Sequence, residues 1–175
     1  LLLSRAVGSW SMYSARNIQL TGYTIATSKL PDGLDRLRIM VMSDIHLSES
    51  IGPRELRQIA ALVEEQRPDI IAVAGDLVDT DMRARGEDAE ILRGMHATYG
   101  KYAVMGNHEC SRGLRKSRDF MRKSGLTILE NRAVDDASGI IVAGIDDPVM
   151  PPNPEAPADP EALLQKQDQS KFILL

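Results

Sequence analysis

The sequence has a single cysteine and few aromatic residues among its 175 residues. One cysteine, Cys110, excludes an internal disulfide framework. Phe, Trp and Tyr make up only 4% of the chain, so aliphatic side chains and methionine must fill the core. Because 43% of the residues are hydrophobic, the chain can still form one domain with a substantial core.

The sequence also has no excess of positive charge. Its net charge of −4 provides no basic field for nucleic acid, so we expect no specific nucleic-acid binding. A phosphorylated substrate stays compatible with this charge, because bound metal ions can supply local positive charge. The chain has neither a G-x-G-x-x-G nor a G-x-x-x-x-G-K-[ST] loop, which argues against a nucleotide-binding α/β protein.

Long apolar runs are missing as well. The opening "LLL" is far short of the ~20 apolar residues that a membrane span needs, so the sequence holds no complete transmembrane or signal segment. We expect an irregular apolar segment over 1–22 and one domain over 23–175. The start without Met and the apolar end "KFILL" lead us to expect a fragment of a longer protein. The apolar start hints at membrane association of that parent, whose location is otherwise undetermined.

The chain does contain an alternation of apolar runs and amphipathic segments. Strands are predicted at 23–27, 37–43, 68–75 and 101–106, with further short strands within 127–147. The spacing of apolar residues predicts helices at 53–66, 86–98, 113–124 and 160–167. A proline-rich loop is expected over 147–160. This order predicts an α/β protein with a mostly parallel sheet covered by helices.

Polar side chains follow each of the three central strands. These are Asp44 and His46, then Asp76 and Asp79, then Asn107, His108 and Glu109. Successive clusters lie about 30 residues apart, the length of one βαβ unit. Right-handed crossovers then bring the carboxyl ends of the strands to one sheet edge, where open α/β folds bind ligands. Each cluster alone is compatible with turn chemistry, but their common placement favours one shared site.

The residue types in these clusters suit hard or borderline metal ions. Mixed oxygen and nitrogen donors without a thiolate favour Mn, Fe, Zn or Mg. Asp44 and His46 would face the same way on an extended chain and could share one ion. A shared carboxylate can bridge two cations about 3.5–4 Å apart, the arrangement that attacks phosphate esters.

The blocks D-x-H (44–46), G-D-x-x-D (75–79) and G-N-H-E (106–109) resemble the first three signature blocks of the calcineurin-like metallophosphoesterases. The "GIDD" segment (144–147) is similar to a loop region of bacterial members. This resemblance implies a four-layer αββα sandwich with a centre of two divalent metal ions between the sheets. It implies hydrolysis of a phosphomonoester or phosphodiester by metal-activated water. The substrate would be a phosphorylated small molecule, a nucleotide or a lipid.

The resemblance also implies a role for each residue. The implied metal ligands are Asp44 and His46 on the first ion, Asp76 on both ions and Asn107 on the second. His108 would protonate the leaving oxygen as the general acid. Asp79 would hydrogen-bond His108 and keep it oriented and charged.

The chain departs from the family in its final part. Complete members continue with a strand ending in His and a G-H-x-H block, whereas the histidines here are His46, His96 and His108. The expected domain is therefore incomplete at its carboxyl-terminal end. We expect weak metal binding and little or no hydrolysis by this chain alone. A non-catalytic binding or scaffold module that keeps the fold is the alternative.

Several other polar residues have simpler interpretations. His96 is expected at a helix end and Cys110 in packing. Glu109 is interpreted as a helix-start residue. Asp146 and Asp147 either approach the site or form an ordinary turn before Pro148. A basic cluster could steer phosphate but is more typical of a solvated helix face; its members are Arg112, Arg115, Lys116, Arg118, Arg122 and Lys123.

Overall fold

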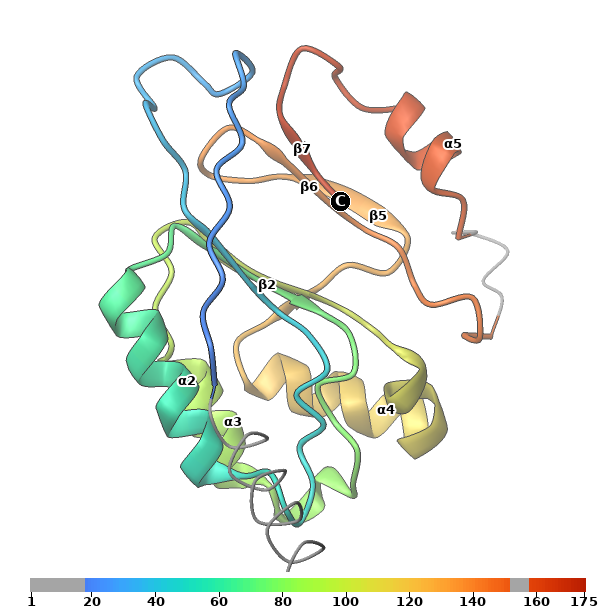
Figure 1. The fold of residues 1–175 in the computed structure, drawn as a ribbon. Helices are drawn as coiled ribbons and strands as arrows, with labels where there is room; N and C mark the ends of the chain where they lie inside the picture. Colours follow the sequence, from blue (N-terminus) through green and yellow to red (C-terminus); the bar gives the residue numbers. More distant parts are fainter. Residues whose placement is uncertain (1–17, 152–157) are drawn as a thin grey trace, which may run out of the picture.

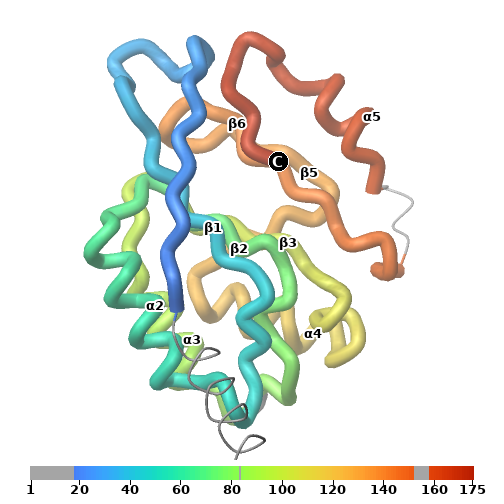
Figure 2. The backbone as a smooth tube through the Cα atoms, in the orientation of Figure 1, coloured from blue at the N-terminus to red at the C-terminus, as the bar shows by residue number. Residues whose placement is uncertain are grey.

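The computed structural model describes residues 18–151 and 158–175, which form two sheets and their covering helices (Figures 1 and 2). A four-stranded sheet has the order β1-β2-β3-β4, and a three-stranded sheet has the order β5-β6-β7. Most of the predicted segment 1–22 and part of the proline-rich loop lie outside the described residues.

The four-stranded sheet is parallel throughout, as the β-α-β order predicted. Its strands are β1 (Ile39–Met42), β2 (Ile70–Ala74), β3 (Gly100–Val104) and β4 (Thr127–Ile128). The central strand β2 is apolar on both faces because helices cover one face and the second sheet covers the other. The edge strand β1 is less covered than predicted, since Val41 is 61% exposed.

Helices α2 (Pro53–Gln66), α3 (Gly86–Gly94) and α4 (Asn107–Lys123) lie on the side of this sheet away from the second sheet (Figure 1). The bounds of α2 match the prediction. Helix α3 ends four residues before the predicted residue 98. Lys101 on β3 explains this end, because its Nζ donates to the carbonyl oxygens of Leu92 and Arg93 at 2.8 and 2.9 Å. These are carbonyls that an ending helix leaves without intrahelical partners.

Helix α4 begins earlier than predicted. The sequence placed its start at Gly113, whereas the helix begins at Asn107, directly after the turn that follows β3. Gly113 has φ 108° and ψ 100°, so it breaks the helix into two parts rather than starting it. The backbone N–H of Gly106 donates to the side chain of Glu109 at 2.7 Å, and this capping contact stabilises the early start.

The second sheet packs over the first and encloses a separate apolar core. Its strands are β5 (Arg132–Asp135), β6 (Ile141–Gly144) and β7 (Ile173–Leu174). Strand β5 is antiparallel to β6, and β7, from the "KFILL" run, is parallel to β6. Ile70, Leu129, Ile140 and Val142 are buried between the sheets. Helix α5 (Pro160–Gln165) lies beyond the second sheet in Figure 1. This mixed α/β arrangement agrees with the predicted sandwich.

The strand predicted at 23–27 is wrong. This segment has no strand assignment, and Tyr23 and Ile25 are 88% and 75% exposed. Its alternating apolar pattern suits a strand, but within the described residues no neighbouring strand pairs with it. A β pattern without a partner strand does not form a ladder.

Candidate metal centre

The carboxyl ends of three adjacent parallel strands carry the candidate site. Backbone hydrogen bonds continue past the strands and tie the following loops together. The N–H of Asp44 donates to the carbonyl of Gly75 at 3.3 Å, and the N–H of His46 donates to the carbonyl of Asp76 at 3.0 Å. The loops after β1 and β2 are therefore held in register up to the residues that could bind a ligand.

The backbone of these loops is left-handed at the residues that matter most. Asp44, His46 and Asp76 have φ values of 54°, 50° and 50°. The extended geometry expected for Asp44 and His46 is therefore wrong, although Asp and His tolerate this region better than most residues. Such conformations cost on the order of 1–3 kcal/mol each and cluster at functional sites.

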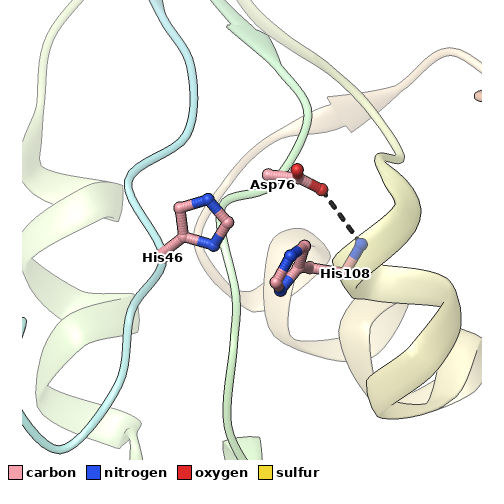
Figure 3. A group of neighbouring side chains, drawn as sticks. All are labelled: His46, Asp76 and His108. Atoms are coloured by element: carbon pink, nitrogen blue, oxygen red, sulfur yellow. Dashed lines mark hydrogen bonds between the residues drawn. The ribbon is translucent and has the colours of Figure 1, made fainter.

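Three side chains from three elements converge at this edge (Figure 3). They are His46 from the loop after β1, Asp76 from the loop after β2 and His108 from the first turn of α4. One potential ligand atom from each lies within 4.8 Å of the others. The two imidazole rings meet edge to face, with centroids 4.4 Å apart and planes at 77°. Two imidazoles and a carboxylate form a donor set that suits Zn, Fe or Mn.

Asp44 lies at the rim of this group. Its Oδ1 is 3.8 Å from Nε2 of His46, and its side chain is 68% exposed. It is not among the three residues whose ligand atoms lie together. The hydroxyl of Ser43 donates to its other oxygen at 2.5 Å.

Asn107 faces the carboxylate of Asp76. One atom of its amide is 3.0 and 3.3 Å from the two Asp76 oxygens. With the amide nitrogen in this position, Asn107 donates two hydrogen bonds. The amide oxygen in the same position would face only acceptors. Asn107 therefore lies next to Asp76, as two predicted ligands of one ion must.

His108 is fixed by a hydrogen-bonded chain of side chains. Its Nδ1 donates to Oδ1 of Asp79 at 2.8 Å. Nε and Nη2 of Arg112 donate to the same oxygen at 3.0 and 2.9 Å. The hydrogen bond that His108 donates to Asp79 raises the pKa of His108, and the Asp76 charge adds to this shift. In turn, the hydrogen bonds from His108 and Arg112 lower the pKa of Asp79. This leaves Nε2 of His108 for a ligand or a substrate.

The other polar residues noted in the sequence lie outside the group of His46, Asp76 and His108. His96 is exposed and lies beyond the end of α3, so it is not part of the converging group. Cys110 is half-buried and packs against the main core, in line with its expected packing role. The N–H of Asp147 donates to the carbonyl of Met105 at 3.4 Å, which brings the "GIDD" loop next to the end of β3. Asp146 instead forms two hydrogen bonds with Asn131.

Sequence reasoning missed two contributions. The basic cluster that contains Arg112 is more typical of a solvated helix face, but Arg112 donates two hydrogen bonds to Asp79. Glu109 was interpreted as a helix-start residue, but it is fully buried and also contacts the loop after β2. The G-x-x-E spacing could have indicated the capping contact of Glu109, whereas no local pattern indicates the contact of Arg112 with a residue 33 positions away.

Comparison with known proteins places this arrangement in a family context. The model of the calcineurin-like phosphoesterase family matches residues 37–151. An uncharacterised metallophosphoesterase of Aquifex aeolicus is 34% identical over 84% of this chain and 56% of its own length. An uncharacterised metallophosphoesterase of Bacillus subtilis is 31% identical over 90% of this chain and 56% of its own length. A zebrafish (Danio rerio) protein named as a transmembrane protein with a metallophosphoesterase domain is 32% identical over 70% of this chain and 30% of its own length. The chain thus spans about half the length of the first two relatives.

Proposed function

The chain belongs to the calcineurin-like phosphoesterase family, and we propose that the complete protein is a metal-dependent hydrolase of a phosphomonoester or phosphodiester. The convergence of His46, Asp76 and His108 from three elements carries this proposal. Asp44 and His46 would hold a first divalent ion, Asp76 would contact both ions, and Asn107 would hold the second. When bound, the ions supply positive charge to the phosphoryl oxygens and lower the pKa of the attacking water.

The protein's own residues orient the reaction and move a proton. We assign His108 as the general acid that passes the proton on Nε2 to the leaving oxygen. Its hydrogen bond to Asp79 supports this role, because a raised pKa favours the protonated imidazole. Arg112 supports it in turn by fixing the carboxylate that holds the ring. A substrate phosphate bound to ions that Asp76 and Asn107 would hold would lie next to this ring.

Hydrolysis by the complete protein is the direct test. The purified protein is loaded with Mn²⁺ and assayed on p-nitrophenyl phosphate and on bis(p-nitrophenyl) phosphate, with and without a chelator. Turnover of either ester that the chelator abolishes supports the proposal. Binding of Mn²⁺ without turnover of esters would instead favour a non-catalytic binding module.

Replacing Asp79 with asparagine is expected to change the pH dependence of hydrolysis. The variant keeps a hydrogen-bond acceptor but removes the carboxylate whose hydrogen bond with His108 contributes most to the raised pKa of that ring. The pKa of His108 then falls, so the acid form is lost at a lower pH. The alkaline limb of the rate profile is expected to move to lower pH in Asp79→Asn. An unchanged alkaline limb, measured as kcat/KM from pH 5 to 10, would contradict the role of Asp79.

We also propose that the complete protein associates with membranes. Two vertebrate relatives are named as transmembrane proteins with a metallophosphoesterase domain. Across residues 18–151 and 158–175, none of the helices is both long and apolar enough to cross a bilayer. Ile18, Leu20, Tyr23 and Ile25 nevertheless present apolar side chains near the start of the described chain. Fractionation of cells expressing the complete protein is expected to recover it with membranes, and recovery only in the supernatant would refute this proposal.

A further inference from the structure

Glu109 is a fully buried glutamate in the first turn of α4, with 0% of its surface exposed. Glutamate is almost never fully buried unless its carboxylate is paired. Burying an ionised carboxylate is costly without hydrogen-bond donors around it. The hydrogen-bond partners of Glu109 therefore indicate what this buried side chain does.

The partners of Glu109 are three backbone N–H groups from two different loops. Its Oε2 accepts hydrogen bonds from Gly106 at 2.7 Å and from Asp76 at 3.0 Å. Its Oε1 accepts a hydrogen bond from Val78 at 2.9 Å. The contact with Gly106 is an ordinary capping contact at the start of α4. The contacts with Asp76 and Val78 are not part of helix capping, since both residues belong to the loop after β2.

Helix α2 has the same capping contact at its start. It also begins after a glycine, and Glu55 accepts a hydrogen bond from the N–H of Gly52 at 3.1 Å. Glu55 is only half-buried. The two helices therefore share the G-x-x-E spacing, while Glu109 has two further bonds to the loop that carries Asp76.

The loops joined by Glu109 fit together closely. A Cβ atom on Gly106 would lie 2.2 Å from Oδ1 of Asp76, so no side chain fits there. The same Oδ1 accepts the N–H of His108 at 3.0 Å. Asp76 has a left-handed backbone conformation with φ 50°. Oε2 of Glu109 accepts the N–H of Asp76 and also the N–H of Gly106. Asn107 follows Gly106 directly, so the carboxylate of Glu109 helps to set the separation of Asp76 and Asn107.

We infer that Glu109 is a positioning residue that sets the spacing between Asp76 and Asn107 and thereby the affinity for the second metal ion. This inference rests on the proposed function, which assigns Asp76 and Asn107 to that ion. Glu109 itself contacts neither substrate nor ion. It acts through the backbone of the two loops, much as outer hydrogen-bond partners orient metal ligands elsewhere.

The test compares Glu109→Gln with the matched capping variant Glu55→Gln in the complete natural protein. Glutamine keeps the shape of the side chain but has only one acceptor oxygen, so in either orientation of the amide its NH2 group meets an N–H of the loop after β2, that of Asp76 or that of Val78. Calorimetric titration with Mn²⁺ is expected to show the weaker site losing about 10–100-fold in affinity in Glu109→Gln. Glu55→Gln is expected to keep both affinities. Hydrolysis by Glu109→Gln should fall at low Mn²⁺ and recover at saturating Mn²⁺, which loss of a group that contacts substrate would not allow.

The outcomes separate this inference from the proposed function. If the natural protein binds two Mn²⁺ ions and folded Glu109→Gln binds both with unchanged affinity, the positioning role is overturned while the proposed function stands. If the natural protein binds no Mn²⁺, both fail. Should Glu109→Gln not fold, Glu109→Asp keeps the charge but withdraws the carboxylate by one methylene. It is expected to show the same selective loss at the weaker site, and unchanged binding would again overturn the inference.

Discussion

Replacing His108 with alanine is expected to lower turnover by about 10²–10⁴-fold, the usual contribution of general acid catalysis. Metal content should stay unchanged, because His108 is proposed to donate a proton rather than to bind an ion. The hydrogen bond from Nδ1 to Asp79 raises the pKa of the ring and leaves Nε2 for the leaving oxygen. Turnover is measured on the complete protein, and metal content is measured by elemental analysis of the same samples.

The choice of leaving group makes this prediction specific. A general acid matters most when the leaving oxygen is strongly basic, so the loss should be large for an alkyl phosphate and smaller for p-nitrophenyl phosphate. His96→Ala serves as the control, because His96 is exposed beyond α3 and is not among the converging residues. An equal fall in turnover of both esters would contradict the role of His108. A fall in metal content that accompanies the fall in turnover would also contradict it.

Replacing Asp76 with asparagine is expected to have the largest effect on metal binding. Asp76 is proposed to contact both ions, so loss of its charge should weaken both sites. The loss of affinity should exceed the ~10–100-fold that is typical when a hydrogen-bond partner of a metal ligand is replaced. Turnover should fall on the order of 10³-fold or more, because metal ions contribute several kcal/mol to transition-state stabilisation. Asparagine can still accept the N–H of His108, so the start of α4 should remain folded.

The opposite end of β2 offers a matched control for this variant. Asp69 precedes the strand, and its Oδ2 accepts the N–H of Arg38 at 2.7 Å. Asp69→Asn also removes one carboxylate next to β2 but lies at the other end of the strand. Calorimetric titration with Mn²⁺ should show normal binding in Asp69→Asn and severe loss in Asp76→Asn. Similar binding by the two variants would exclude Asp76 as a shared ligand.

The convergence of the three polar clusters could be predicted because it follows from topology. Strands that are joined by right-handed crossovers and lie side by side bring their carboxyl ends to one edge, whatever the local details. Helix α2 was also predictable, because its apolar spacing and the proline at its start are local signals. The order of the elements therefore indicated which residues meet, even though they are far apart in the chain.

The local geometry at that edge could not be predicted from the sequence. The left-handed backbone at Asp44 and His46 depends on hydrogen bonds to the loop after β2, which no local pattern encodes. Helix α4 starts at Asn107 because Glu109 caps it, and Gly113 breaks it instead of starting it. The hydrogen bond from Arg112 to Asp79 joins two elements that meet only after folding. These features depend on tertiary contacts, so propensity alone misplaces them.

The most direct test is the crystal structure of the complete protein with Mn²⁺, with the ions located by anomalous scattering. The proposed function predicts two ions about 3.5–4 Å apart, with the carboxylate of Asp76 between them and Nε2 of His108 bound to neither. A single ion held by His46, Asp76 and His108 would contradict it, because His108 would then be a ligand and not the proton donor.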